Sequence, residues 1–168
     1  DTRANAWAGN EVVAPVAEAV KALRPMVKLA EEYGVVLQME LFNSIVDHPD
    51  YMADSSRWGI ELARALNSPS FKLLYDIYHM QIMEGDLIVR IKKFHPYIAH
   101  YHTGGVPGRN EIDDTQEINY PAVMAAIEST GFEGYVALEY LFTTNKKESM
   151  ARSFTEFIRL LHCNHLIL

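Results

Sequence analysis

Hydrophobic positions along the chain alternate between the spacing of an amphipathic helix and the spacing of a strand. The first segment, residues 12–33, follows the helical spacing, with Pro25 expected to interrupt or kink the helix and Gly34 to end it. Short apolar runs further along the chain predict buried strands. The pattern runs without repeats or a linker and predicts one architecture of five helices and four strands.

The predicted strands cover residues 35–41, 71–78, 98–101 or slightly beyond, and 135–140. The further helices are predicted over residues 55–66, 86–94, 119–131 and 147–161, the first of them capped by Asp54. Strands that alternate with helices at this spacing need right-handed crossovers, which give a parallel sheet. In such α/β folds the active residues are expected where strands end and loops begin.

Near the end of each predicted strand stands one residue of a type that binds metal ions: Glu40, Asp76, His102 and Glu139. A carboxylate at the end of an apolar strand is costly to bury unless it is paired, hydrogen-bonded or bound to a metal. A capped loop or a salt bridge would explain any one of these residues taken alone. Four such residues at equivalent places in successive strand-loop units favour a cluster of metal ligands. Three carboxylates and one imidazole suit Mg2+ or Mn2+, and Co2+ or Zn2+ less well.

Three further polar residues lie near these strand ends. His79 follows Asp76 by three residues, where its imidazole is expected to reach a substrate oxygen rather than the metal. Arg109 lies in the long polar loop 103–118 and could clamp a carboxylate or hydroxyl of a ligand, with a solvated loop arginine as the alternative. His100 shares a strand face with His102, where a core histidine and a functional one are equally compatible.

Length, charge and cysteine content narrow the class of protein. The 168 residues are enough for a single domain, residues 1–168, with its own core. A formal net charge of −7 argues against binding to nucleic-acid phosphates and favours small polar ligands or metal cations. The single cysteine cannot form an internal disulfide, and no apolar run has the roughly 18 residues of a membrane span. We therefore expect a cytoplasmic protein with no membrane partner.

Several motifs together resemble those of the xylose-isomerase-like TIM-barrel superfamily, most closely its hydroxypyruvate isomerase branch. They are MELFN around Glu40, DIYHMQ with EGDL, HYHTGGVPGRNE, EINY and GYVALEY. The resemblance covers nearly the whole chain and is specific only as a set. It implies a metal held by the four strand-end residues, with His79 and Arg109 at substrate-contacting positions. One departure is His102, because hydroxypyruvate isomerases commonly have Gln there and ketose 3-epimerases have His.

The expected activity is that of a metal-dependent isomerase of small hydroxy-carbonyl compounds. Proton transfer beside a carbonyl would pass through a metal-stabilised enediolate, with Glu40 and Glu139 as base and acid. A ketose 3-epimerase, or another sugar isomerase or dehydratase of the superfamily, is the main alternative. A non-catalytic sugar-binding relative is disfavoured by the intact Glu40 and Glu139. A nuclease of the endonuclease IV type is disfavoured by the negative charge.

The number of strands predicts an incomplete barrel. A closed (β/α)8 TIM barrel needs eight strands and typically about 250 residues. The four strands therefore predict the C-terminal half of such a barrel, with residues 1–9 reading as the end of a strand-helix loop. An open four-stranded sheet would leave two unpaired edges. We expect the natural protein to carry a further N-terminal half that covers them, and this chain alone either to pair with another copy as a homo-oligomer or to be a fragment.

Overall fold

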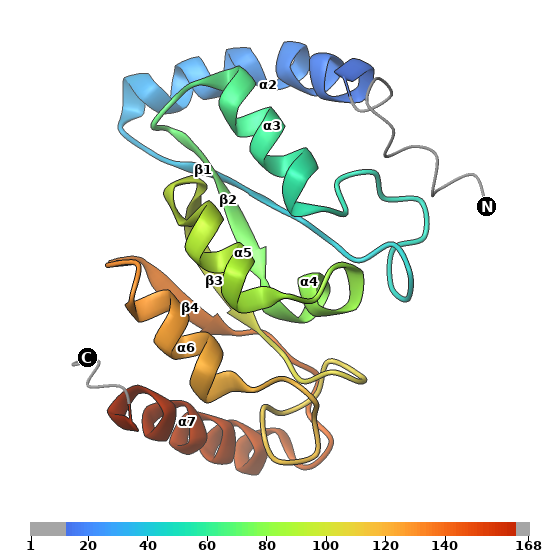
Figure 1. Cartoon of the computed structure of the whole chain (residues 1–168), viewed down its shortest axis with the longest axis vertical. Coiled ribbons are helices and arrows are strands. Elements are labelled where there is room, and N and C mark those ends of the chain that lie inside the picture. Colours follow the sequence, from blue (N-terminus) through green and yellow to red (C-terminus); the bar gives the residue numbers. More distant parts are fainter. Residues whose placement is uncertain (1–12, 164–168) are drawn as a thin grey trace.

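The computed structural model describes residues 13–163, whose helices and strands alternate along the chain (Figure 1). In chain order the elements are α2 (Val13–Tyr33), β1 (Leu37–Glu40), α3 (Ser56–Leu66), β2 (Phe71–Asp76), α4 (Ile77–Met83), α5 (Leu87–Phe94), the 3-10 helix η1 (His95–Tyr97), β3 (Ile98–Thr103), α6 (Tyr120–Glu128), β4 (Tyr135–Leu138) and α7 (Lys146–Cys163). The first helix was predicted to start at residue 12, and residues 1–9 were predicted to form the end of a strand-helix loop. Both positions lie outside the described residues. None of the described helices is long and apolar enough to cross a membrane.

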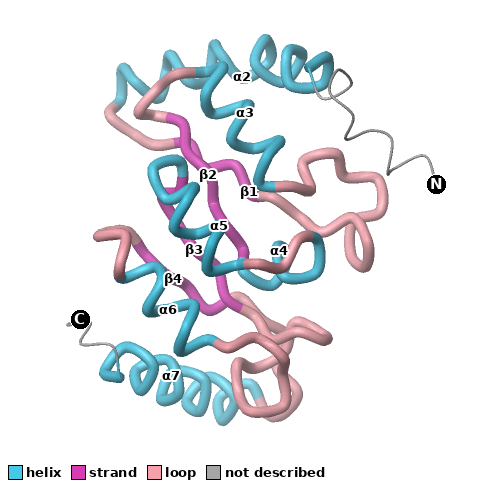
Figure 2. Tube along the Cα trace, in the orientation of Figure 1, coloured by secondary structure: helices cyan, strands magenta, loops and turns pink. Residues whose placement is uncertain are grey.

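All four strands are parallel and form one sheet in the order β1-β2-β3-β4. The register places Asp76 beside His102, and Glu40 beside Leu74, so the strands end along the same edge. The long loops after β1 and β3 gather at that edge, to the right in Figure 2. The predicted half of a TIM barrel, with four parallel strands alternating with helices, is therefore confirmed.

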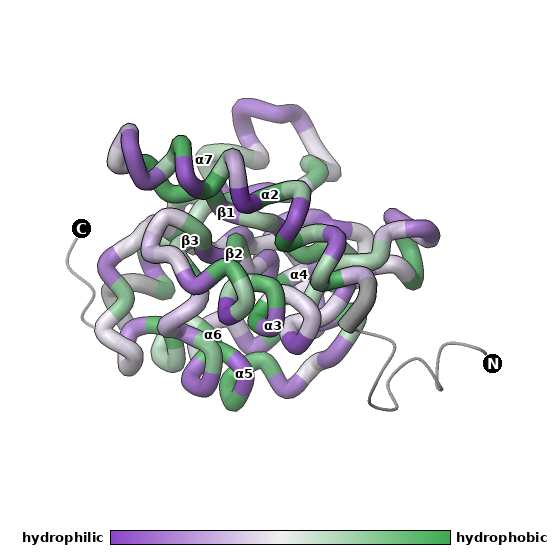
Figure 3. The backbone as a smooth tube through the Cα atoms, turned by 90° about the horizontal axis from the view of Figure 1, so that it is seen from above, coloured by the Kyte–Doolittle hydropathy of each residue, from purple (hydrophilic) through white to green (hydrophobic). Residues whose placement is uncertain are grey.

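The core lies between the sheet and the helices on its outer side. Figure 3 shows the strands in the interior with helices around them, and apolar and polar positions alternating along the helices. Side chains with almost no exposure include Leu62 of α3, Leu73 and Tyr75 of β2, and Ile91 of α5. In contrast, β1 and β4 contain no fully buried residue. The sheet is therefore well covered at its centre and open at both edges.

Strand β2 is shorter than the sequence predicts. It ends at Asp76, and α4 begins at Ile77, whereas the apolar run predicted a strand to residue 78. The Asp76 Oδ1 atom accepts hydrogen bonds from the backbone N–H groups of Tyr78 (2.8 Å) and His79 (3.3 Å). This carboxylate therefore caps a helix that the sequence analysis missed, and the predicted extension of the strand is wrong.

The predicted cap of α3 and the predicted interruption of the first helix at Pro25 are also wrong. Ser55, rather than Asp54, caps α3, because its side chain accepts a hydrogen bond from the Trp58 N–H at 3.3 Å. Asp54 instead accepts a hydrogen bond of 2.5 Å from Ser44 Oγ. Helix α2 continues through Pro25, which is exposed, so that water can reach the carbonyl left without its helical partner.

Candidate active site

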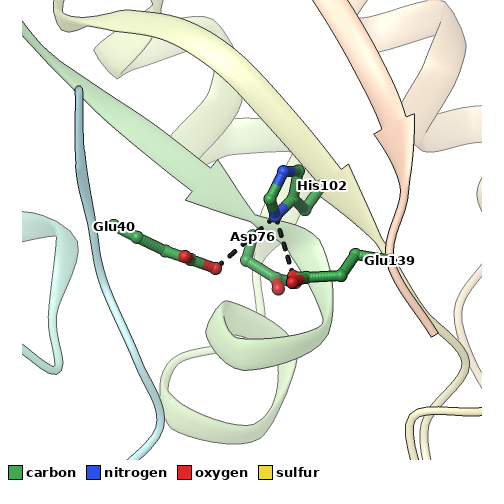
Figure 4. Close-up of side chains that lie close together, drawn as sticks. All are labelled: Glu40, Asp76, His102 and Glu139. Carbon is green, nitrogen blue, oxygen red and sulfur yellow. Dashed lines mark ion pairs between the residues drawn. The ribbon is translucent and has the colours of Figure 1, made fainter. Parts of the chain in front are cut away.

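Glu40, Asp76, His102 and Glu139 come together where the four strands end (Figure 4). Each offers one ligand-type atom, and these atoms all lie within 4.8 Å of one another. The parallel register explains the convergence, because successive strands deliver their last residues to one edge of the sheet. The structure thus brings together all four residues that the sequence analysis selected as a ligand cluster.

His102 lies between the two glutamates. Its Nδ1 atom is 2.8 Å from Glu139 Oε2 and 3.5 Å from Glu40 Oε1. Among the described residues, however, Nδ1 and Glu40 Oε1 are buried without a hydrogen bond of acceptable geometry. Glu40, followed by Glu139, raises the pKa of the imidazole. Buried nitrogen and oxygen atoms that face one another without hydrogen bonds suit a shared cation, so these residues fit a divalent metal.

Asp76 is the most deeply buried member of the cluster, with no exposed side-chain surface. Burial raises its pKa to about 7, Arg109 opposes the shift, and the nearby Glu40 adds to it. Near neutral pH, Asp76 is therefore still partly protonated even with Arg109 beside it, and further positive charge would favour its carboxylate form. A cation at the cluster would supply that charge.

Arg109 reaches into the same cluster from the loop after β3. Its Nη2 atom donates hydrogen bonds to Asp76 Oδ2 at 2.9 Å and to Glu139 Oε2 at 2.5 Å. Its guanidinium carbon lies 5.2 Å from the centre of the Tyr78 ring. The backbone of Arg109 has a positive φ of 57°, and its carbonyl accepts a hydrogen bond from the Leu141 N–H at 2.6 Å. Arg109 is thus held against the cluster rather than solvated in the loop.

His79 lies beside the cluster but within the protein. The ring has no exposed surface, and its Nε2 atom is 3.7 Å from Asp76 Oδ2. Burial, with a further contribution from Arg109, lowers the pKa of His79 to about 3, so the imidazole is neutral. Its predicted contact with a substrate stays a prediction. His100 packs edge-on against His102, with ring centres 5.0 Å apart, and is not a member of the cluster.

Sequence patterns did not indicate the residues that surround His79. The Asn43 backbone N–H donates a 3.0 Å hydrogen bond to His79 Nδ1, and the Asn43 side chain also faces this atom. Asp47 accepts hydrogen bonds from Asn43 Nδ2 at 2.7 Å and from the Tyr78 hydroxyl at 2.8 Å. The available signal was the position of Asn43 in the MELFN motif, three residues after Glu40.

A half-barrel of parallel strands with a carboxylate and histidine cluster at the strand ends defines part of a TIM-barrel protein. Residues 5–160 match the family model described as xylose isomerase-like TIM barrel, and the chain belongs to this family.

Named relatives of the chain are isomerases. Hydroxypyruvate isomerase from Escherichia coli (strain K12) is 32% identical over 121 residues, which cover 72% of this chain and 46% of that protein. 2-Oxo-tetronate isomerase from Cupriavidus necator is 32% identical over 111 residues, which cover 66% of this chain and 42% of that protein. The chain thus spans less than half the length of either relative.

Among solved structures, the AP endonuclease, family 2 from Brucella melitensis superposes with a TM-score of 0.79 and 27% sequence identity. The superposition covers 89% of this chain and 57% of that chain. The fold of the described residues therefore agrees with the family assignment.

Proposed function

We propose that the chain carries the catalytic metal centre of an isomerase that acts on small hydroxy-carbonyl acids such as hydroxypyruvate. The observation that carries this proposal is the arrangement of Glu40 and Glu139, which come from opposite edges of the sheet and face each other beside Asp76 and His102 (Figure 4). The similarity to relatives named hydroxypyruvate isomerase and 2-oxo-tetronate isomerase supports the choice of substrate class.

Glu40, Asp76, His102 and Glu139 would hold the metal. The set is rich in carboxylate oxygen, which Mg2+ and Mn2+ prefer. When bound, a divalent cation supplies positive charge beside the carbonyl oxygen of the substrate and so lowers the barrier to removing a proton from the neighbouring carbon.

Glu40 and Glu139 then exchange protons with the substrate. One carboxylate removes the proton from the hydroxyl-bearing carbon beside the carbonyl, which leaves an enediolate. The hydroxyl proton passes to the former carbonyl oxygen, and the other carboxyl group returns a proton to the former carbonyl carbon, so that the carbonyl and hydroxyl groups exchange places. Both side chains keep exposed surface, 21% for Glu40 and 48% for Glu139, so a small substrate can reach them. Asp76 is fully buried and serves only as a ligand.

Arg109 is proposed to bind a carboxylate or hydroxyl group of the substrate. Its guanidinium contacts Asp76 and Glu139 and therefore lies where the reacting carbons must come. Guanidinium groups bind carboxylates through several N–H donors at once, which would orient a short hydroxy-carbonyl acid. His79 is proposed to donate a hydrogen bond to an oxygen at the same site.

A ketose 3-epimerase is the second candidate, and the imidazole of His102 favours it. The same two glutamates would serve, because epimerisation also removes and returns a proton beside a carbonyl. Nuclease activity fits less well, since a net charge of −7 opposes the approach of a nucleic-acid backbone.

The proposal is tested by following hydrogen exchange in deuterated water. The chain is incubated with Mg2+ or Mn2+ and with hydroxypyruvate, a 2-oxo-tetronate or a ketose, and the carbon-bound protons are observed by NMR. We expect deuterium to enter the carbon beside the carbonyl of a hydroxy-carbonyl acid faster than with the metal ion alone. Exchange restricted to ketoses would select the epimerase, and exchange with none of these compounds would reject both.

A further inference from the structure

The side-chain amide of Asn43 has a fixed orientation. Its Oδ1 atom accepts hydrogen bonds from the backbone N–H groups of Val46 at 3.0 Å and Asp47 at 2.9 Å. Two N–H donors can face only the amide oxygen, so the assignment of oxygen and nitrogen in this buried side chain is determined by its partners. The Nδ2 group must therefore point in the other direction, where Asp47 Oδ2 accepts from it at 2.7 Å.

That orientation determines which ring nitrogen of His79 carries the proton. Asn43 Nδ2 lies 2.7 Å from His79 Nδ1, and the Asn43 backbone N–H donates to the same ring nitrogen at 3.0 Å. A ring nitrogen that faces two N–H donors can only accept, and it cannot carry a proton of its own. The proton of the neutral ring is then on Nε2.

The Nε2 atom of His79 faces the proposed metal cluster. It is 3.7 Å from Asp76 Oδ2, and within the described part of the chain it is buried without a hydrogen-bond partner. The ring itself is held in place, because Phe42 and His48 pack against it with ring centres 5.1 and 5.6 Å away. A buried donor without a partner destabilises the resting protein, and an acceptor that reaches it during function would explain why it is kept.

We propose that Asn43 is a positioning residue that holds His79 as the neutral tautomer with its proton on Nε2, so that the imidazole donates a hydrogen bond to a negatively charged oxygen at the cluster. A ring locked in this form can stabilise negative charge and cannot act as a base. The tautomer follows from contacts within the protein, whereas the use of the donor during turnover rests on the proposed function.

The tautomer is measured directly by long-range 1H–15N NMR of the metal-free chain, with 15N in the histidine rings. The His79 signals are identified by their loss in His79→Gln. We expect the nitrogen pattern of a neutral Nε2–H imidazole in the unsubstituted protein. In Asn43→Asp a carboxylate oxygen replaces the Nδ2 donor and only the backbone N–H still faces Nδ1, so we expect the Nε2–H form to lose population to the form with a proton on Nδ1.

Asn119→Asp is the matched control, because Asn119 caps α6 and should leave the His79 signals unchanged. A proton on Nδ1 of His79 in the unsubstituted protein would overturn the proposal, and so would an unchanged His79 pattern in a folded Asn43→Asp. If Asn43→Asp does not fold, the spectrum of the unsubstituted protein still shows whether Nδ1 of His79 carries a proton. None of these results depends on isomerase activity, so they are separate from the test of the proposed function.

The same spectra identify the acceptor oxygen. A shift of Nε2 on adding Mg2+ alone would assign the donor to the Asp76 carboxylate, and a shift only on adding hydroxypyruvate with Mg2+ would assign it to a substrate oxygen. A His79 Nε2 signal that responds to neither addition would overturn the proposed donor role.

Discussion

Arg109 Nη2 lies 2.9 Å from Asp76 Oδ2 and also contacts Glu139, so one guanidinium bridges two of the four proposed metal ligands. Its positive charge opposes the rise in the pKa of Asp76 that burial causes. A divalent cation bound by the same carboxylates would share them with Arg109 or displace it. If Arg109 binds the substrate as proposed, its position would couple substrate binding to the charge of the proposed metal site.

We expect Arg109→Ala to raise the KM for the substrate more than it lowers kcat, because a clamp on a carboxylate or hydroxyl that takes no part in the proton transfer contributes mainly uniform binding. Arg109→Lys should not restore function fully, since an ammonium cannot reproduce the planar guanidinium contacts. Arg159→Ala on the exposed side of α7 is the control. Steady-state kinetics with equal losses in kcat and kcat/KM would contradict this role.

Replacing Glu139 by glutamine should abolish turnover while the fold stays intact. The substitution removes a charge from the proposed metal site and a proton-transfer group together, and positioned acid-base groups typically contribute about 100-fold or more. Deuterium exchange measures the rate, and circular dichroism checks the fold. Glu133→Gln, an exposed change shortly before β4, should behave like the unsubstituted protein. A Glu139→Gln rate above about a tenth of normal would exclude the assigned role.

Mn2+ affinity should rise with pH up to about 7. The pKa of Asp76 is raised from 3.8 to about 7 by burial. The stabilisation that the protonated Asp76 side chain gives to the metal-free fold is therefore complete below pH 3.8, and it is lost as the pH rises through about 7. Mn2+ must displace this proton, so calorimetry should detect proton release that diminishes above pH 7.

Asp76→Asn should bind Mn2+ more weakly and lose most of this pH dependence, because the amide has no proton to release and no charge to offer. The same calorimetric titration measures the Mn2+ affinity of this variant and its dependence on pH. Unchanged Mn2+ binding in this variant would show that the four-ligand set is wrong.

Glu111 should stabilise the loops beside the site through its negative charge. Although burial alone would raise its pKa, hydrogen bonds from Ser149 and Thr143 lower the pKa to about 2. The stabilisation is present above pH 4.5 and is lost as the pH falls through about 2. Glu111→Gln should therefore reduce the free energy of unfolding at pH 7 by about 2 kcal/mol.

Urea denaturation over a range of pH checks the role of Glu111. The difference from the unsubstituted protein should shrink towards pH 2, and the exposed Glu148→Gln on α7 serves as control. A loss of the same size at every pH would mean that packing, rather than charge, explains the effect.

The strand-end rule was sufficient to select the cluster, because parallel strands bring their last residues to one edge whatever the loops do. It could not show that Asp76 also caps α4, since the apolar run around this residue fits a strand and a helix equally well. The predicted end of β2 was therefore wrong, although Asp76 lies in the predicted cluster.

Sequence patterns could not predict contacts between segments that lie far apart in the chain. Arg109 meets the cluster because its loop is fixed by a hydrogen bond from Leu141, which follows β4. Asn43 meets His79 across 36 positions of sequence. Neither contact has a periodic signal, and each depends on how the loops pack once the sheet has formed.

The most direct test of the central claim, that four strand-end side chains form one metal site, is a Mn2+ titration followed by electron paramagnetic resonance of the free ion. We expect one Mn2+ bound per chain, and loss of that binding when Glu40 and Glu139 are both replaced by glutamine. A chain that binds no Mn2+, or a folded double variant that binds it as the unsubstituted protein does, would show that these side chains do not form a metal site.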